Sequence, residues 1–273
     1  MKKVLDDIGY VLVLATIVLT VIFLLAPLGM AALMSFDSRT FLGPFPPPSL
    51  SLDWYGKFFS NEFYLAGLKT SLILAVTAAS ISTVSGVAAA IVLDRYSFPG
   101  KDALLAFFLS PLMVPGVVIG FSLLLFFSLI GVFDGFARLL GGHIIITLPY
   151  TIRTTLAGLV GINRSFTEAA LSLGANERQA FWEVTFPLGK TGMVAGAVFA
   201  FAFSMDDVAA SIFLTDPTSV TLPVAMVSMM RTTFDLSIAA GSVMLVILTV
   251  LLILVLDRMV GLGRVVGQGM YRA

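Results

Sequence analysis

Long apolar runs alternate with short polar segments along this chain. An α-helix rises about 1.5 Å per residue, so about 20 residues cross the hydrocarbon core of a membrane, which is about 30 Å thick. Lipid offers the backbone no hydrogen-bond partners, so each run is predicted to be a helix, and the chain an all-α polytopic membrane protein. The predicted spans cover about 8–34, 66–93, 102–130, 142–162, 188–215 and 237–256.

Composition supports a membrane protein and excludes several other classes. The chain is 58% hydrophobic and 12% charged, whereas soluble domains are usually about 25% charged. A formal net charge of zero gives no indication of a nucleic-acid partner. The absence of cysteine excludes disulfides, thiol catalysis and cysteine metal sites, and the single histidine, His143, allows no histidine-based metal site. His143, at the start of the fourth span, is interpreted as structural.

The distribution of basic residues predicts the orientation of the chain. The first span has 27 uncharged residues from Ile8 to Met34, which is longer than the core of a signal peptide, so it is predicted to be retained. A cytoplasmic N-terminus places ten Lys and Arg residues inside and five outside. Both termini are therefore predicted to be cytoplasmic, and the remaining basic residue, Arg153, is left inside the fourth span.

The longest predicted outer segment, about 35–65, has two parts. Pro44 and Pro46 to Pro48 rule out a regular helix and predict a stiff, extended strap. Aromatic residues follow from Leu52 to Phe63 and predict a helix at the outer headgroup level. Two roles stay open for this helix, namely anchoring in the membrane interface and docking of a partner.

Small residues mark two spans as internal. Alanine, serine and glycine recur along the second span, and the fifth contains Gly192-x-x-x-Gly196. Small faces let helices approach closely in lipid, so both spans are predicted to pack inside the bundle.

The polar segment 163–187 is predicted to form two short helices joined by a glycine. Ser165 and Glu168 have the spacing of a capping box, which would begin the first helix. Gly174 supplies a left-handed stop. A second helix can start near Asn176 and end before the membrane. Pro187 suits the first turn of the following span.

The same segment resembles the cytoplasmic "EAA" loop of ABC importer permeases, which has the pattern E-A-A-x3-G-x9-I-x-L-P. Val184 and Phe186 stand where the family has isoleucine and leucine; the matching residues are Glu168, Ala169, Ala170, Gly174 and Pro187. The resemblance implies one domain over residues 1–273, built as a type I permease bundle of six helices. It also implies that the loop 163–187 docks on an ATPase. An amphipathic loop lying on the lipid surface is the alternative.

The resemblance also implies the partners of this chain. They are a second, unlike permease subunit, two copies of an ABC ATPase and an extracytoplasmic solute-binding protein, assembled in the bacterial plasma (inner) membrane. Gly189-Lys190-Thr191 is similar to the end of a phosphate-binding loop, but Val184 stands where that loop needs glycine, and no strand precedes it. The chain is therefore expected to hold no cofactor and to catalyse no reaction, with ATP and Mg²⁺ bound by the ATPase.

Two adjacent carboxylates lie deep in the fifth span. A carboxylate at the bilayer centre costs about 2.5–3.5 kcal/mol, so Asp206 and Asp207 are expected to face protein, water or a cation. A continuous helix would place Ser204, Asp207 and Ser211 on one face. Asp207 is therefore predicted to line the substrate path, and Asp206 to pair with Arg153. The alternative is that the aspartates cap a helix near the outer surface.

The segment from Phe203 to Val208, followed by Leu222-Pro223, is similar to the spermidine/putrescine branch of the permease family. This likeness implies a cationic or amine-bearing solute, and a path that includes Asp206, Asp207, Ser204, Ser211 and Arg153. Arg153 departs from that branch. It either neutralises an aspartate or binds a carboxylate of a zwitterionic amino-acid derivative such as an opine.

Two other classes of function fit the sequence less well. A proton-coupled secondary transporter could use Asp206 or Asp207, but the halves of the chain show no inverted repeat and such a protein needs no docking loop. A membrane enzyme would need a nucleophile and base or a metal set, and the sequence brings none together.

Overall fold

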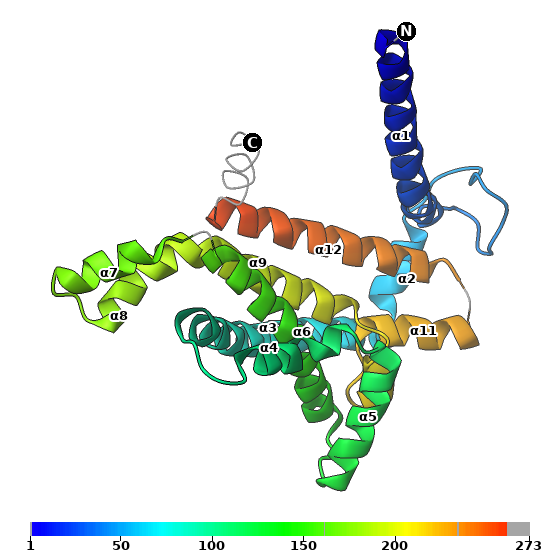
Figure 1. Ribbon diagram of the computed structural model, residues 1–273. Coiled ribbons are helices and arrows are strands. Elements are labelled where there is room, and N and C mark those ends of the chain that lie inside the picture. Colours follow the sequence, from blue (N-terminus) through cyan, green and yellow to red (C-terminus); the bar gives the residue numbers. More distant parts are fainter. Residues whose placement is uncertain (1, 161, 234, 261–273) are drawn as a thin grey trace. The chain divides into compact units, whose positions relative to one another are not determined.

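The computed structural model describes residues 2–160, 162–233 and 235–260. Most of this part is helical, and it holds no β-strand, only two isolated bridges, so the predicted all-α fold is confirmed (Figure 1). The elements are α1 (Lys2–Met34), α2 (Asp53–Ser60), α3 (Glu62–Arg95), α4 (Lys101–Leu109), the 3₁₀ turn η1 (Ser110–Leu112), α5 (Gly116–Leu129), α6 (Gly135–Val160), α7 (Arg164–Ser172), α8 (Glu177–Ala180), the π-helical segment η2 (Phe181–Thr185), α9 (Phe186–Asp206), α10 (Ser211–Leu214), α11 (Leu222–Thr232) and α12 (Ser237–Val260).

Four helical stretches of the described chain are long and apolar enough to cross a membrane. They are Gly9–Met34, Glu62–Arg95, Gly135–Val160 and Glu177–Asp206. A shorter apolar helix covers Ser237–Leu252. The pattern is that of a multi-pass membrane protein, while the direction in which each span crosses stays a prediction.

The predicted third span, 102–130, is not one helix. It is broken between Leu112 and Gly116, and its two parts meet at an angle of 104°. Two prolines explain the break, because Pro111 lies in η1 and Pro115 directly precedes α5. Proline cannot donate the backbone hydrogen bond that a continuous helix needs.

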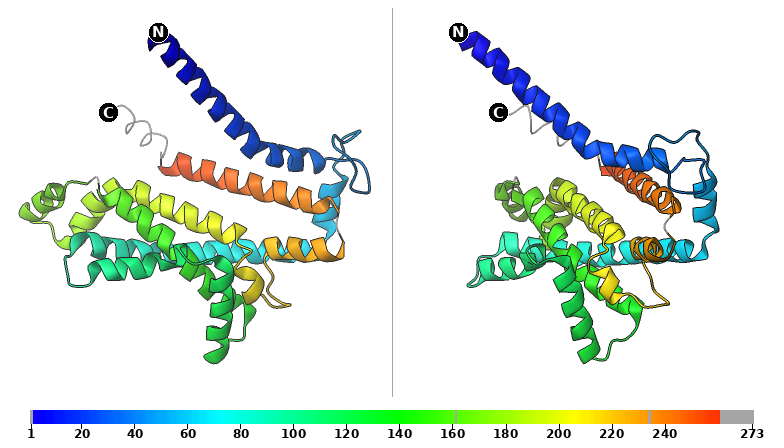
Figure 2. Two further views of the ribbon diagram at one scale, coloured as in Figure 1. Left: turned by 45° about the vertical axis from the view of Figure 1, so that its right-hand side comes forward. Right: turned by 90° about the vertical axis from the view of Figure 1, so that its right-hand side faces the viewer.

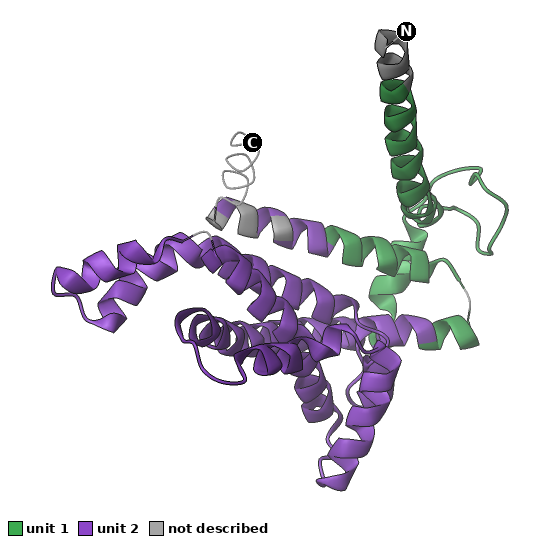
Figure 3. Cartoon of the chain, in the orientation of Figure 1, with its two compact units in different colours: residues 1–62, 228–247 green, residues 63–227, 248–273 purple. Residues whose placement is uncertain are grey.

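The chain divides into two compact units, coloured separately in Figure 3. The first comprises residues 1–62 and 228–247, and the second comprises 63–227 and 248–273. In the first unit, α2 is held by the ion pair between Lys57 Nζ and Asp235 Oδ2, which are 2.5 Å apart. The Lys57 ammonium also lies 5.1 Å from the centre of the Trp54 ring.

The aromatic residues of α2 pack differently from the prediction of an interfacial helix. Trp54 is 5% exposed and Phe58 is fully buried, while Phe59 is exposed. Tyr55 Oη lies 2.8 Å from Ser35 Oγ at the end of α1. Most of this aromatic face therefore packs against protein, and only a minor part is available to headgroups.

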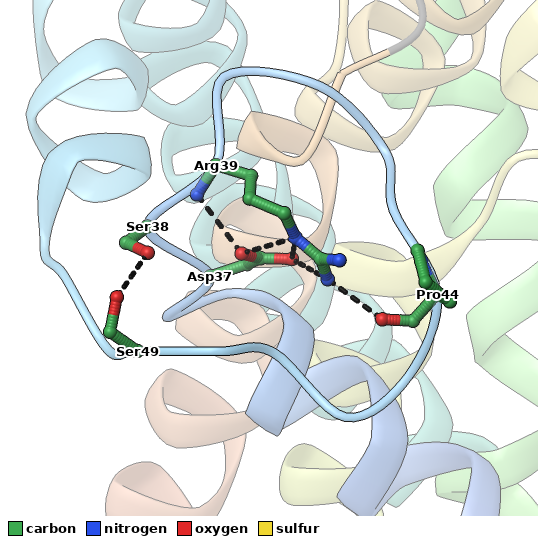
Figure 4. Close-up of polar contacts among 5 residues, drawn as sticks. All are labelled: Asp37, Ser38, Arg39, Pro44 and Ser49. Atoms are coloured by element: carbon green, nitrogen blue, oxygen red, sulfur yellow. Dashed lines mark hydrogen bonds and ion pairs between the residues drawn. The ribbon is translucent and has the colours of Figure 1, made fainter.

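The proline-rich segment after α1 is a closed loop, not the extended strap that was predicted (Figure 4). Its ends meet, because Ser51 N donates to Phe36 O and the hydroxyls of Ser38 and Ser49 are 2.5 Å apart. Inside the loop, the Arg39 guanidinium donates to both oxygens of the buried Asp37 carboxylate and also to Pro44 O. These hydrogen bonds hold the pKa of Asp37 below its ordinary value. An internal ion pair therefore closes a segment that the prolines alone would leave extended.

The second unit is organised around α6 and α9, which lie side by side (Figure 2). They approach closely at Gly158 and Gly192, where a Cβ on either residue would come within 2.8 Å of the other's Cα. One turn further along α9, Gly196 lies against Thr151 and Thr154. The predicted small-residue packing of the fifth span is therefore confirmed.

A column of buried polar side chains joins α6 to α3. Thr147 and Thr151, one turn apart on α6, are both fully buried. Ser82 Oγ of α3 lies 2.7 Å from Thr147 Oγ1, and Thr151 Oγ1 donates to Ser82 O at 2.8 Å. Gly86 leaves room for Thr151, whose hydroxyl lies 1.9 Å from where a Cβ would stand. Interhelical hydrogen bonds of this kind support helix association in lipid.

Candidate functional site

The segment predicted as a docking loop forms a knob of two short helices, α7 and α8. Within the second unit it lies beyond the ends of α6 and α9 (Figure 1). Gly174 joins the helices with a φ of +94°, a left-handed conformation that favours glycine. Ala175 N donates to Ala170 O, which closes the end of α7. The predicted glycine stop is confirmed.

The caps of the knob differ from the prediction. Asn163, not Ser165, caps α7, because its side-chain oxygen accepts from Ser165 N at 3.0 Å. Ser165 therefore lies inside the helix and forms no capping box with Glu168. A capping box does occur at α8, where Asn176 and Gln179 exchange backbone and side-chain hydrogen bonds of 2.9 Å. The predicted start of the second helix at Asn176 is correct.

The second helix of the knob does not end before the membrane. It passes through the π-helical segment η2 directly into α9, so that Glu177–Asp206 is one helical stretch of 30 residues. Pro187 lies in the first turn of α9, as predicted. Single π turns inside helices are often found at functional sites. The knob is thus continuous with the span that reaches the acidic pair.

The outer surface of the knob combines the residues of the motif with exposed apolar side chains. Glu168 and Ala169 are exposed and Ala170 is half-buried. Around them, Phe166 is 57% exposed and Leu173 is 89% exposed, and Trp182 of η2 is also exposed. Clustered exposed apolar residues of this kind are typical of protein interaction surfaces.

At its base, the knob is attached to the end of α3. Arg164 Nη2 donates to Asp94 O at 2.6 Å, and Arg95 Nη2 donates to Thr185 Oγ1 at 3.2 Å. A cavity of about 300 Å³ opens between these residues and is also lined by Glu168. This attachment was not predicted, because arginines near helix ends are common and nothing in the local sequence pattern assigns their acceptors.

Asp207 ends α9, and its carboxylate binds the backbone at the start of the next short helix, α10. The predicted span 188–215 stops as a helix at Asp206, and Asp207 is extended, with ψ of 122°. The Asp207 carboxylate accepts from Ser211 N and Ser211 Oγ, each at 2.9 Å, and from Ala210 N at 3.2 Å. This arrangement corresponds to the helix-cap alternative and rules out the continuous helical face on which Asp207 was placed.

His143 connects this cap to the helix bundle. It is fully buried on α6, and its ring nitrogens lie 2.7 Å from Ser204 Oγ and 2.9 Å from Ser211 Oγ. Ser204, Ser211 and Asp207 do come together, as predicted, but through the imidazole and not through helical periodicity. The structural interpretation of His143 is consistent with these contacts.

Asp206 and Arg153 do not pair. His143 lies beside Ser204, so Asp206 is at the level of the start of α6, whereas Arg153 is ten residues further along α6, about 15 Å by helical rise. Both side chains are exposed, and neither forms an ion pair within the described part of the chain. The predicted Asp206–Arg153 pair is therefore wrong, because the contact between α6 and α9 sets a different register. Whether either residue lines a substrate path stays a prediction.

Replacing Asp207 by alanine is expected to lower the free energy of unfolding by about 1–2 kcal/mol, the usual loss when an N-terminal helix cap is removed. Asp206→Asn is the matched control, because Asp206 accepts no hydrogen bond in the described chain, and a change within about 0.5 kcal/mol is expected. Unfolding of the purified protein by SDS titration measures both. Equal losses in the two variants would contradict the capping role.

Comparison with known proteins agrees with this architecture. Residues 82–262 match the family described as "Binding-protein-dependent transport system inner membrane component". The chain is 33% identical over 201 residues to the spermidine/putrescine transport system permease protein PotC of Escherichia coli K12, covering 74% of this chain and 76% of that protein. It is 30% identical over 216 residues to the putrescine transport system permease protein PotI of the same strain, covering 77% and 76%.

Solved structures show the same fold. A chain of a bacterial alginate ABC transporter, crystallised in complex with an alginate-bound periplasmic protein, has a TM-score of 0.73 at 18% identity, covering 93% of this chain and 94% of that one. A chain of the MetNI methionine ABC transporter has a TM-score of 0.62 at 18% identity, covering 72% and 94%. The chain therefore belongs to the family of binding-protein-dependent transport system inner membrane components, the permease subunits of ABC importers.

Proposed function

We propose that this chain is a permease subunit of a bacterial inner-membrane importer for polyamines or related small amine-bearing solutes. The observation that carries the solute class is the 33% identity with PotC over 74% of the chain. The exposed carboxylate of Asp206, which has no ion-pair partner in the described chain, supports a cationic solute.

The proposed importer needs three kinds of component besides this chain. A second, unlike permease completes the path, two copies of an ABC ATPase bind ATP and Mg²⁺, and an extracytoplasmic binding protein delivers the solute. The ATPases contact the exposed faces of the knobs around Glu168 and Ala169. Closure of the ATPases on ATP pushes the knobs together, and the continuous helix from α8 to α9 carries this movement into the bundle.

Reconstitution of the full complex in proteoliposomes tests the proposal. ATP-dependent uptake of labelled putrescine or spermidine is expected, with competition by unlabelled diamines and none by sulfate. A complex that carries an inactive ATPase is the control and should take up nothing. Uptake driven by a proton gradient in that control would instead favour a proton-coupled transporter.

A second solute class is favoured by Arg153. This guanidinium is exposed on α6 and has no ion-pair partner within the described residues, so it can bind a carboxylate. The alternative solute is a zwitterionic amino-acid derivative or opine. Competition of the labelled uptake by such zwitterions, lost in Arg153→Gln, would favour it over a simple polyamine.

A further inference from the structure

The closed loop 36–51 that follows α1 exposes several apolar side chains. Phe41 is 63% exposed, Phe45 is 49% exposed and Leu50 is 66% exposed, and Leu42, next to Phe41, is exposed as well. Exposed apolar residues gathered in one short segment mark a surface that contacts a protein or a membrane. The loop is therefore expected to have a partner of one of these two kinds.

The charges of this loop are hidden. Residues 36–51 include two charged residues, Asp37 and Arg39, and residues 40–52 include none. The Asp37 side chain is fully buried and the Arg39 side chain is 15% exposed, because the two form an ion pair inside the loop. Surfaces that dock a protein usually surround an apolar centre with a polar rim. The loop offers no charged residue for such a rim, and this favours a membrane as its partner.

The prolines reduce the number of backbone donors that the loop must satisfy. Four of the eight residues from Phe41 to Pro48 are prolines, which have no backbone N–H. An N–H group without a hydrogen-bond partner is costly in lipid, where water is absent. The Pro44 carbonyl in the same stretch already accepts from Arg39 Nη2. The stretch 41–48 therefore enters a membrane interface at a lower cost than an ordinary loop of the same length.

The loop lies at the end of a helix that is long enough to cross a membrane. Gly9–Met34 has 26 residues, about 39 Å by helical rise, against about 30 Å for the hydrocarbon core. The hydrogen bond from Ser51 N to Phe36 O closes the loop two residues after Met34. Both views of Figure 2 show the loop beside the end of α1. The headgroup layer at this end of α1 is therefore within reach of the loop.

We propose that loop 36–51 is a membrane anchor, which inserts Phe41, Leu42 and Phe45 into the headgroup layer at the end of α1. These side chains bury apolar area at the boundary between headgroups and acyl chains, as other interfacial segments do. The Asp37–Arg39 ion pair keeps the two charges of the loop away from lipid, where a free charge is costly. The loop thus has the anchoring role that the sequence suggested for the aromatic helix after it.

Spin labels on single cysteines test the anchor, because the wild-type chain contains no cysteine. Phe41→Cys and Phe45→Cys each carry a nitroxide in the full complex, assembled with cysteine-free partner subunits in phosphatidylcholine vesicles. Power saturation compares the contact of each label with oxygen, which is enriched in lipid, and with a water-soluble nickel chelate. Leu19→Cys, at an exposed position within α1, gives the lipid reference, and Thr218→Cys, on an exposed polar turn, gives the water reference. Both loop labels are expected to resemble Leu19→Cys.

A second pair of variants tests the role of the ion pair. Arg39→Gln leaves the Asp37 carboxylate without its cation, so the label at Phe41 is expected to lose contact with oxygen and gain contact with nickel. Ser49→Ala is the matched control, because it removes the hydrogen bond to Ser38 but frees no charge. The label should stay in lipid in this control. Equal contacts in the two variants would contradict the role of the ion pair.

The contacts of the loop labels also distinguish lipid from other partners. Labels that resemble Thr218→Cys place the loop in water and overturn the anchor. Low contact with both oxygen and nickel means that another subunit covers the loop, and this also overturns it. A label that meets nickel until the solute-binding protein is added, and neither probe afterwards, assigns the loop to docking of that protein instead of lipid.

Discussion

Gly174→Pro is expected to abolish ATP-dependent uptake while the chain still inserts into the membrane. Gly174 holds a φ of +94°, and proline is confined to about −65°, so the turn between α7 and α8 cannot form. The α8 helix would then leave its place beside α7, and the exposed face around Glu168 would be lost. Uptake into proteoliposomes, with ATP hydrolysis measured in parallel, measures the loss of ATP-dependent transport.

Gly174→Asn is the matched control for that experiment. Asparagine tolerates the left-handed conformation better than other residues with a side chain, and a Cβ at Gly174 meets nothing within 4 Å. This variant should therefore retain most of the uptake. If the Gly174→Pro complex contains normal amounts of ATPase and takes up solute at the wild-type rate, the knob does not have the proposed docking role.

The second large effect is expected from Gly192→Ala at the contact between α6 and α9. A Cβ at this position would lie 2.6 Å from Thr154 O and 2.8 Å from Gly158 Cα, both backbone atoms that cannot move away singly. The helices must separate along their length. A loss of about 1–3 kcal/mol in the free energy of unfolding is expected, as for other overpacked cores.

Gly29→Ala in α1 is the control for Gly192→Ala, because nothing lies within 4 Å of a Cβ at Gly29. This change should be neutral or slightly stabilising, since alanine favours helix more than glycine does. SDS titration of both purified variants gives the comparison. If Gly192→Ala and Gly29→Ala have similar free energies of unfolding, the close contact between α6 and α9 does not contribute the expected stability.

The features that depend on local sequence were predictable. Gly174 and Asn176 mark a turn and a helix start through the conformations that these residue types favour, and both predictions are correct. The break near Pro115 was also visible in the sequence. The length and hydropathy of the run 102–130 predict one continuous span, although Pro111 and Pro115 are residues that interrupt a helix.

The features that depend on the register between helices were not predictable. Which face of α6 meets α9 is set by the contact of Gly158 with Gly192, two positions that are 34 residues apart in the chain. That register places His143 beside Ser204 and separates Arg153 from Asp206. Periodicity within one helix carries no information on these pairs, so the expected ion pair was wrong.

The position of that glycine contact along the α8–α9 helix has a mechanical consequence. Gly192 is 15 residues from Glu177 at one end and 14 from Asp206 at the other. If the helix pivots at this contact, its two arms have nearly equal lengths, each about 21–22 Å by helical rise. A tilt of about 10° on this fulcrum would carry the two ends about 4 Å in opposite directions. A displacement of the knob in one direction would therefore displace Asp206 by a similar distance in the opposite direction.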